Sequence, residues 1–376
     1  MTARLPAPFR DRDETMARPG PAAWRRALAL LRGGALAVAL LCAGAAPEAR
    51  AEPPIRLKIV GGLAGVRQFT QFEEPFWSRT IGVLSGGRIE ASIHSFDRSG
   101  LRGQDMLQVM RLGVVPFGTA IVSVVAGDDP ELSAIDLPGL SPDTAALRRT
   151  VEAYRPHLAA LLQERYGIEL LGVYAYPAQV LYCAKPFRGL DDLAGRRVRT
   201  SSVNQSEWIA ALGAVPVITP FAEMVGAITK GVAECAITGT LSGAEVGLTR
   251  VTSHVHGMAI GWGVSIFGAN RAAWEALAPD LRETVRRGVA DLERSIWQAA
   301  EQDTVQGLAC ISGAACEGTR RAGLTLVVPS PADEARRRRL LVETVLPGWI
   351  ERCGDACAEA WNGTIAASLG IRAGAR

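Results

Sequence analysis

The feature that most constrains the fold is a repeated alternation of strand patterns and helix patterns between residues 55 and 270. The strand patterns are short apolar or alternating runs that end in turn residues. The helix patterns between them carry apolar residues three and four positions apart. Such alternation is typical of βαβ units, in which helices cover a mostly parallel sheet. We therefore predict an α/β protein, and a chain of 376 residues has room for about two domains.

The expected elements follow the chain in order. Strands are expected at 55–62, within 85–96, after Gly113 within 103–125, and at 168–176, 196–202, 215–219, 234–239 and 257–270. Helices are expected at 68–84, before Gly113 within 103–125, and at 143–165, 204–212, 221–231 and 274–309. The last helix would span about 50 Å if it were continuous, at about 1.5 Å per residue. A helix of that length could cross both halves of a two-lobed molecule.

The first 51 residues resemble a secretory signal. A basic segment at 24–32 precedes an apolar segment at 34–46, and Ala49-Arg50-Ala51 matches the small-x-small rule for cleavage before Glu52. The apolar segment is shorter than the ~20 residues that span a bilayer. We therefore expect residues 1–51 to be removed on export, with Met16 as a possible true start. The Arg25-Arg26 pair leaves the export route, general secretory or twin-arginine, open.

The charge of the chain is concentrated in this leader. Residues 1–51 contain eight arginines and four acidic residues, a net charge of +4, so the rest of the chain carries 3 − 4 = −1. The basic character of the whole sequence would be lost with the leader. Nucleic-acid binding therefore loses its main support, because that function depends on basic side chains that neutralise phosphates.

Six cysteines follow the leader, at 183, 235, 310, 316, 353 and 357. An even number of cysteines in an exported protein favours disulfides, although six cysteines allow about 15 pairings. CISGAAC (310–316) and CGDAC (353–357) could each close a small loop, or could pair with one another. Zinc binding is less favoured, because neither spacing is the usual C-x-x-C and no histidine lies nearby.

A catalytic interpretation is also open to the sequence. Cys183 or Cys235 could act as a thiol nucleophile with His254 or His256 as the base, and the two histidines could also hold a metal. Neither cysteine stands in a nucleophile motif, and no third metal ligand is evident. We therefore expect no enzyme activity, no metal and no cofactor, and keep a secreted thiol- or metal-dependent enzyme as the alternative.

The segment LAGRRVRTSS (193–202) holds three arginines on an expected strand. Strand alternation places Arg197 and Arg199 on one face, and Arg196 with Val198 on the other. A guanidinium can form two parallel hydrogen bonds to a carboxylate, and a hydroxyl such as that of Thr200 or Ser201 can add another. These residues therefore suit a carboxylate ligand.

The chain resembles the DctP-type solute-binding proteins of tripartite ATP-independent periplasmic (TRAP) transporters from about Ile55 to Ala309, and more weakly beyond. SGGRIEASIHSF, followed by SGLRGQDMLQVMRLGVV, is similar to the family pattern "sGGri.v.v.p.gqlG…e.le.v..G.iD". DLAGRRVRTSS with ALGAVPVITPFAEMVGAITKGVAE is similar to "DLkGlkiRvp … ALGa.pv.mpf.EvytALq.GvvDg". This second block is specific, because strand, spacing and helix agree over some forty-five residues.

The resemblance implies a periplasmic protein with two α/β lobes, a ligand cleft between them and a long helix that braces both. We expect the first lobe to comprise residues 52–176 and about 262–300. The second lobe would comprise 177–261 and about 301–376, including the C-terminal helices. The resemblance further implies a monomeric protein that passes a small organic acid to membrane permease subunits. A ligand-sensing role beside a membrane receptor is the alternative within the same fold.

The resemblance also implies the ligand-binding positions. Arg199 matches the arginine that pairs with the ligand carboxylate, and Phe221 matches an aromatic residue that lines the site. Gln179 lies at or near a second basic or amide position, Thr238 replaces an asparagine, and Thr119 stands where some relatives place polar or acidic contacts. The site therefore keeps one arginine and loses other charges, which favours a monocarboxylate with an apolar or hydroxylated body over a multiply charged sugar acid.

Overall fold

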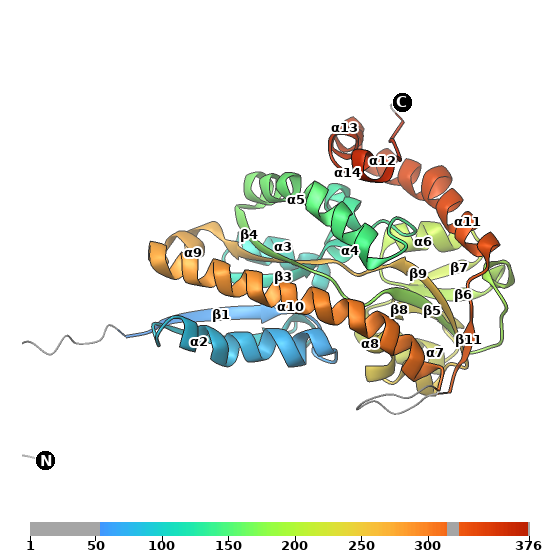
Figure 1. The fold of residues 1–376 in the computed structure, drawn as a ribbon, viewed down its shortest axis with the longest axis horizontal. Helices are drawn as coiled ribbons and strands as arrows, with labels where there is room; N and C mark the ends of the chain where they lie inside the picture. Colours follow the sequence, from blue (N-terminus) through green and yellow to red (C-terminus); the bar gives the residue numbers. More distant parts are fainter. Residues whose placement is uncertain (1–52, 314–322, 375–376) are drawn as a thin grey trace, which may run out of the picture. The chain divides into compact units, whose positions relative to one another are not determined.

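A computed structural model describes residues 53–313 and 323–374 of the chain. The predicted signal segment and Cys316 lie outside these residues. Within the described ranges, no helix has the length and apolar character needed to cross a membrane. The described chain forms two β-sheets with helices packed on them (Figure 1).

The first sheet has five strands in the order β2-β1-β3-β10-β4. Its strands are β1 (Ile55–Gly61), β2 (Ile89–Ser95), β3 (Phe117–Ile121), β4 (Ile168–Tyr174) and β10 (Ser265–Asn270). β1 pairs in parallel with β2 and β3, whereas β10 runs antiparallel to β3 and β4. The expected parallel sheet is therefore a mixed one, because β10 enters it from the opposite end.

The second sheet has six strands in the order β11-β9-β5-β8-β6-β7. They are β5 (Gln179–Cys183), β6 (Arg197–Thr200), β7 (Val215–Ile218), β8 (Cys235–Gly239), β9 (His254–Gly261) and β11 (Thr325–Val327). β6 pairs in parallel with β7 and β8, and β5 runs antiparallel to β8 and β9. β1 to β4 and β10 form the first sheet, and β5 to β9 and β11 form the second, so the chain passes between the sheets at residues 175–178 and 262–264 and again between β10 and β11.

The α-helices are α2 (Ile81–Leu84), α3 (Met106–Arg111), α4 (Val122–Val125), α5 (Thr144–Tyr166), α6 (Val203–Ala210), α7 (Met224–Thr229), α8 (Thr240–Glu245), α9 (Arg271–Glu275), α10 (Pro279–Ile311), α11 (Pro331–Leu340), α12 (Leu346–Cys353), α13 (Asp355–Gly363) and α14 (Ile365–Leu369). Short π-helical segments are η1 (Gln68–Glu73), η2 (Phe76–Thr80) and η9 (Leu341–Val345). Short 3₁₀ segments are η3 (Phe96–Arg98), η4 (Gly103–Asp105), η5 (Pro130–Asp136), η6 (Leu190–Leu193), η7 (Phe221–Glu223) and η8 (Leu248–Arg250).

Helices cover both faces of the first sheet. On one face α5 packs against β4, and Leu158 and Val173 belong to one apolar cluster. On the other face α10 and α2 pack together, and Val289 and Leu171 belong to a second cluster. α10 also contacts α8 beside the second sheet, and Figure 1 shows it running past both sheets. The predicted role of a long helix that packs on both halves is therefore confirmed.

Several predicted boundaries were wrong. The helix expected at 274–309 is two helices, α9 and α10, because Pro279 lacks a backbone N–H and begins a new helix at its first turn. The strand expected at 257–270 is also two strands, β9 and β10, which belong to different sheets. The strand expected after Gly113 ends at Ile121, where the chain turns into α4.

The C-terminal helices pack on α5, which connects β3 to β4 of the first sheet. α14 contacts α5, and α12 contacts η5. Figure 1 shows α12, α13 and α14 on the same side of the sheets as α5. The assignment of residues 301–376 to the second lobe stays a prediction, and this contact links that segment to residues expected in the first.

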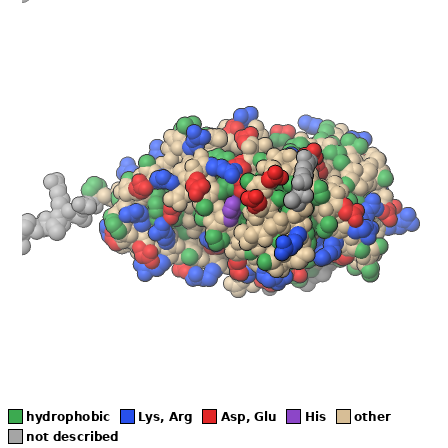
Figure 2. All heavy atoms as spheres, turned by 90° about the horizontal axis from the view of Figure 1, so that it is seen from above, with side chains coloured by type: hydrophobic (Ala, Val, Ile, Leu, Met, Phe, Trp, Pro, Cys, Tyr) green, Lys and Arg blue, Asp and Glu red, His purple; other side chains and the backbone are tan. Residues whose placement is uncertain are grey.

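The surface carries both signs of charge. Figure 2 shows Lys and Arg side chains interspersed with Asp and Glu side chains over one face of the molecule. Many charged side chains form exposed ion pairs, such as Arg56 with Glu90 at 3.2 Å and Lys185 with Glu234 at 3.0 Å. Pairs this exposed contribute about 0–1 kcal/mol each to the free energy of unfolding. On this face, arginine is balanced by acids rather than gathered into a basic stripe.

Candidate solute-binding site

The candidate site lies where the carboxyl ends of the two sheets are joined. β4 ends at Tyr174 and β5 begins at Gln179, while β9 ends at Gly261 and β10 begins at Ser265. Both connections leave the carboxyl edge of the parallel strands in one sheet and enter the same edge of the other. A segment as short as 262–264 spans at most about 15 Å, so these two edges lie close together. Ligands of open α/β sheets bind outside the carboxyl ends of the strands.

Arg199 lies on β6, one residue before that strand ends, and is only 2% exposed. Its Nε donates a hydrogen bond to the Thr219 carbonyl at 2.9 Å, and its Nη1 donates to the Ile237 carbonyl at 3.0 Å. Among residues 53–313 and 323–374, no carboxylate forms an ion pair with it. Burial lowers the pKa of the Arg199 guanidinium to about 10. A buried cation without a counter-ion is costly, and an anionic ligand would offset that cost.

The other two arginines of the segment lie nearer the surface and are bound to the backbone. Arg196 is partly exposed and donates to the carbonyls of Lys185 and Pro186. Arg197 is exposed and donates to the carbonyl of Val232 at 3.1 Å. Arg197 is also 3.5 Å from a carboxylate oxygen of Glu234. Among the three arginines, burial and the absence of an acidic partner in the described chain therefore single out Arg199.

Thr200 and Phe221, two other predicted site residues, have different surroundings. Thr200 follows Arg199 on β6, so its side chain leaves the opposite face of the sheet, where its Oγ1 lies 2.8 Å from Ser206 Oγ of α6. Phe221 begins η7 and is half-buried against the apolar residues on both faces of the second sheet. The aromatic position is thus close in sequence to Thr219, which accepts from Arg199, whereas the Thr200 hydroxyl is engaged with α6.

Thr238 and Gln179 lie on the other strands of the second sheet. Thr238 stands on β8 two residues beyond Ala236, which pairs with Arg199, and is 4% exposed. Gln179 is the first residue of β5 and pairs with Gly239. The second sheet therefore places Arg199, Thr238 and Gln179 at the same edge on three neighbouring strands.

Thr119 belongs to the first sheet and contacts a buried acid that the sequence patterns did not single out. Its Oγ1 donates to Glu73 Oε2 at 3.2 Å. Glu73 also accepts from the backbone N–H of Gly62 and from Gln68 Nε2, each at 2.8 Å. Burial raises the pKa of the Glu73 carboxyl. Glu73 lies on the buried side of η1, and its only signal was an acid within an apolar helix pattern.

Another buried acid holds one of the connections between the sheets. Asp136, at the end of η5, accepts hydrogen bonds from the backbone N–H groups of Trp262 at 2.9 Å and Val264 at 3.0 Å. Burial raises the pKa of Asp136 to about 6, against the lowering effect of these bonds. The carboxylate thereby fixes residues 262–264, which have no strand partner of their own.

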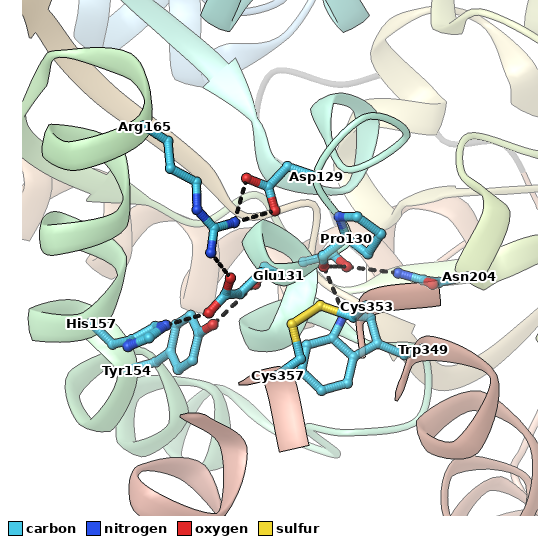
Figure 3. Close-up of a disulfide and its surroundings, with 11 residues drawn as sticks. Asp129, Pro130, Glu131, Tyr154, His157, Arg165, Asn204, Trp349, Cys353 and Cys357 are labelled. Atoms are coloured by element: carbon cyan, nitrogen blue, oxygen red, sulfur yellow. Dashed lines mark hydrogen bonds and ion pairs between the residues drawn. A yellow bond between two sulfur atoms is a disulfide. The ribbon is translucent and has the colours of Figure 1, made fainter. Parts of the chain in front are cut away.

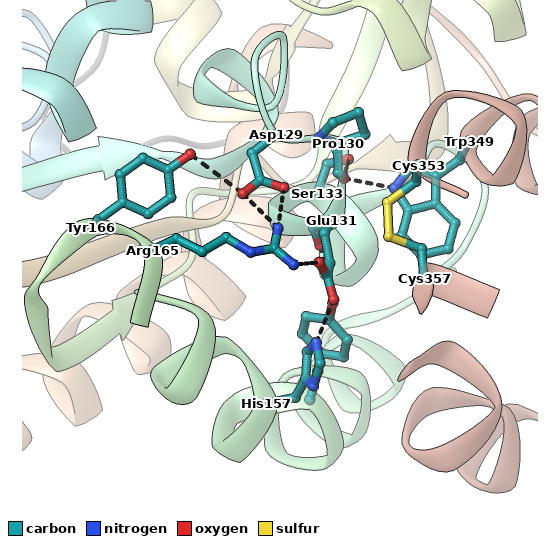
Figure 4. Close-up of polar contacts among 11 residues, drawn as sticks. Asp129, Pro130, Glu131, Ser133, His157, Arg165, Tyr166, Trp349, Cys353 and Cys357 are labelled. Carbon is teal, nitrogen blue, oxygen red and sulfur yellow. Dashed lines mark hydrogen bonds and ion pairs between the residues drawn. A yellow bond between two sulfur atoms is a disulfide. The ribbon is translucent and has the colours of Figure 1, made fainter. Parts of the chain in front are cut away.

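η5 is in turn fixed by a polar network with α5. Figures 3 and 4 show Arg165 between Asp129 and Glu131, at distances of 2.9 and 2.5 Å. Glu131 also lies 2.6 Å from His157 Nε2, and Tyr154 donates to its carbonyl at 3.1 Å. These bonds come from residues 154–165 of α5 and fix the segment that leads to Asp136.

The same segment is tied to α12 and α6. Trp349 Nε1 donates to the Pro130 carbonyl at 2.6 Å, and Asn204 donates to Ser133 Oγ at 3.0 Å. A disulfide between Cys353 and Cys357 joins α12 to α13 beside Trp349 (Figure 3). α12 therefore helps to hold η5 in place.

The disulfides bear on the alternative in which Cys183 or Cys235 is a catalytic thiol. Cys183 and Cys235 lie opposite one another on β5 and β8 and form a disulfide with a Cα–Cα distance of 4.0 Å. Neither has a free thiol, so the structure contradicts the alternative in which one of them acts as a nucleophile. Of the two arrangements left open for the C-terminal cysteines, the structure has the local Cys353–Cys357 pair, and Cys310 is also disulfide-bonded.

The two histidines of β9 have structural partners. His256 is 1% exposed, stacks on Phe187 with ring centroids 6.1 Å apart, and lies 3.6 Å from Asp333. His254 Nδ1 lies 2.8 Å from Ser253 Oγ. Across 53–313 and 323–374, no group of three side chains is arranged to hold a metal ion. Burial lowers the pKa of His256, which favours its neutral form.

A small cavity beside residues 175–178 is lined by charged residues from α8, from α10 and from the turn before η1. Arg67 forms an ion pair with Asp303 of α10, and its backbone N–H donates to Glu245 of α8 at 3.2 Å. Burial and the nearby Asp303 raise the pKa of Glu245 to about 7, against the lowering effect of Arg67. Glu245 is also partly open to solvent, and its neutral form is favoured in the folded protein only below about pH 7.

This raised pKa gives a pH-dependent prediction. The stabilisation associated with neutral Glu245 is fully present below pH 4.5 and is lost as the pH rises through about 7. A Glu245→Gln variant keeps the acceptor for Arg67 and cannot ionise. We compare the free energy of unfolding of this variant with that of the unsubstituted protein at each pH. The difference should shift in favour of the variant by on the order of 1 kcal/mol between pH 5 and pH 8, a figure that allows for the exposed part of the side chain. Denaturant unfolding at both pH values measures this, and an equal difference at both would contradict the assignment.

Comparisons with known proteins identify the family. The model of the bacterial extracellular solute-binding proteins, family 7 (DctP), matches residues 69–317. DctP7 of Bordetella pertussis, a solute receptor that binds pyroglutamic acid, superposes with a TM-score of 0.74 at 22% identity, over 82% of this chain and 99% of that one. A TRAP periplasmic solute-binding protein of Rhodoferax ferrireducens with bound malonate gives 0.72 at 21% identity, over 84% and 98%. The predicted resemblance and fold are confirmed, and the chain belongs to family 7 of the bacterial extracellular solute-binding proteins.

Proposed function

We propose that this protein captures a small organic acid in the periplasm and delivers it to the membrane permease subunits of a TRAP transporter. The observation that carries the proposal is the buried Arg199 guanidinium, which has no acidic partner in the described chain and stands at the strand edge where the two sheets meet. The planar guanidinium can donate two parallel hydrogen bonds to a carboxylate, and a ligand would supply that carboxylate.

The structural relatives support an acid as the solute. The proteins from Bordetella pertussis and Rhodoferax ferrireducens bind pyroglutamic acid and malonate, and a protein from Desulfovibrio salexigens holds orotic acid. Each of these solutes carries a carboxylate. The identities are only 22%, 21% and 17%. The relatives therefore support a carboxylate as the class of solute, and the rest of the solute has to be inferred from the residues of this chain.

The remaining proposed site residues favour a monocarboxylate. Gln179, Thr238 and Thr119 are uncharged, and Phe221 is apolar. Glu73 of η1, which accepts a hydrogen bond from Thr119 of the first sheet, would repel a second carboxylate when ionised. We propose that one carboxylate binds Arg199 and that an apolar or hydroxylated body meets the other four side chains.

The proposed organisation follows from the same strands. The first lobe would carry the strands of the first sheet, the second lobe those of the second sheet, and the two connections and α10 would link them. The leader at residues 1–51 and the disulfide-bonded cysteines support export to the periplasm. We propose that the mature protein works as a monomer.

A thermal-shift panel tests this proposal on residues 52–376. The panel contains monocarboxylates such as pyroglutamate, lactate and 2-oxo acids, the dicarboxylate malonate, and the sugar acid galacturonate. A bound acid at a hundredfold excess over its Kd should add about 2.7 kcal/mol to the free energy of unfolding, and the melting temperature should rise accordingly. We expect the largest rise with a monocarboxylate. No rise with any acid would contradict the proposal, and a larger rise with galacturonate or malonate would contradict the preference.

A further inference from the structure

The orientation of the Gln179 amide is fixed by a residue outside the proposed contacts. Gln205 of α6 donates from its Nε2 to Gln179 Oε1 at 2.7 Å. Gln205 is 5% exposed, and α6 places it three residues after Ser202, whose side chain caps that helix by accepting from the Gln205 N–H at 3.2 Å. The Gln205 side chain therefore has little freedom to move away from Gln179.

The backbone decides which end of the Gln205 amide faces Gln179. Its Oε1 accepts from the backbone N–H of Ser201 at 2.9 Å, and Ser201 Oγ lies 3.1 Å from the same oxygen. A backbone N–H can only donate, so the atom that it meets must be the oxygen. The other end of the Gln205 amide is then NH₂, which can only donate. Gln179 must therefore accept this hydrogen bond with its Oε1, and its NH₂ group points away from α6.

The NH₂ group of Gln179 lies against residues 262–264. A Cβ built on Gly263 would stand 2.5 Å from Gln179 Nε2, so the glycine leaves the space that this amide occupies. Gly263 also has φ of +65°, which favours glycine in its own right. No described residue accepts a hydrogen bond from Gln179 Nε2, and the side chain is partly exposed. A donor is thus held at the strand edge without a partner in the described chain.

We propose that Gln205 is a positioning residue that makes Gln179 a hydrogen-bond donor to the solute. This inference rests on the proposed function, and it names the chemistry of the solute's second polar group. That group must be an acceptor, as the carbonyl oxygen of a 2-oxo acid or of a lactam acid is. An ammonium group at the same place would face the two hydrogens of the amide. The site therefore selects oxo and lactam acids over amine-bearing acids of similar size.

The Gln205→Glu variant tests the direction of this relay. One oxygen of the introduced carboxylate would still accept from the Ser201 N–H, and the other would accept where Gln205 donated. The Gln179 amide would then turn round, donate to position 205 and present its oxygen to the solute. We expect affinity for pyroglutamate to fall about 10- to 100-fold, because two acceptors would meet. Binding of proline, which has the same ring with a CH₂ group in place of the lactam carbonyl and an ammonium in place of the lactam N–H, should fall less or improve, because proline presents no acceptor to the turned amide.

Calorimetry with pyroglutamate and proline, or with a 2-oxo acid and its amino acid, measures the ratio of affinities. The Gln205→Met variant is the matched control, because it removes the relay without reversing it and should weaken the carbonyl acid without favouring the amine. The Gln179→Met variant removes the donor itself and gives the same readout if the Gln205 variants do not fold. An unchanged ratio in Gln205→Glu and in Gln179→Met would overturn the inference.

The inference and the proposed function fail in different ways. If the unsubstituted protein binds no acid of either class, the proposed function is wrong. If it binds acids through Arg199 but the ratio does not respond to positions 205 and 179, only the role of the relay is wrong. Thermal unfolding of each variant without ligand separates loss of binding from loss of folding.

Discussion

Replacing Arg199 with alanine is expected to weaken binding of the acid by about 30- to 5000-fold, which corresponds to ~2–5 kcal/mol. The solute carboxylate would be left without its partner in a buried place, and the lost charge-assisted bonds would not be replaced by water. The variant should still fold. Burial already disfavours the charge of Arg199, as its lowered pKa shows, so its removal costs mainly the two bonds to the Thr219 and Ile237 carbonyls.

The matched control for this prediction stands two residues away on the same strand. Arg197 is exposed and binds the Val232 carbonyl, so Arg197→Ala should leave affinity unchanged. Titration calorimetry of both variants, with the acid found in the thermal-shift panel, gives the comparison. Equal affinity in Arg199→Ala and the unsubstituted protein would refute the assignment of the carboxylate partner. Equal losses in both variants would show a general effect of positive charge instead.

Removing the Cys183–Cys235 disulfide is expected to lower the free energy of unfolding by about 4 kcal/mol. The bond closes a loop with a sequence separation of 52 residues, and the entropy lost by the unfolded chain grows with the length of the loop. Both cysteines are completely buried on central strands of the second sheet, and Cys235 lies on the strand next to the one that carries Arg199. A double Cys→Ala variant also removes packed sulfur atoms, which adds to the loss.

The second disulfide supplies the control. Cys353 and Cys357 are separated by 4 residues, so the same argument gives a smaller loss of about 2 kcal/mol for their double alanine variant. Denaturant unfolding of the two double variants measures both values. A Cys183–Cys235 variant as stable as the unsubstituted protein would contradict the expected contribution. A larger loss from the 353–357 variant would show that loop length does not set the order.

The sequence predicted the elements better than their connections. Glycines and helix caps marked several ends correctly, as at α5, where Asp143 accepts from Ala146 N–H and Gly167 adopts a left-handed conformation. The strand β5 was missed because Gln179–Cys183 follows β4 closely and no helix separates them. The break between β9 and β10 was missed because residues 262–264 continue an apolar run. In both cases the chain changes sheets, and pairing between distant strands decides that outcome.

The site was predictable only in part. Arg199 was singled out by its place in a family motif, and burial supports that choice independently. Glu73, Asp136 and Gln205 were missed because each acts through hydrogen bonds to backbone or side chains that are remote in sequence or fixed only in the fold. The partner of Cys183 was equally hidden, since it depends on the register of β5 and β8. Local patterns carry no signal for such contacts.

The most direct test of the central claim is a calorimetric titration of residues 52–376 with the preferred acid and with its primary amide. The two ligands share shape and size and differ in the charge that Arg199 would bind. We predict that the acid binds and that the amide binds at least about 30-fold more weakly. If the neutral amide binds as tightly as the acid, the carboxylate is not what the protein recognises, and Arg199 is not its partner.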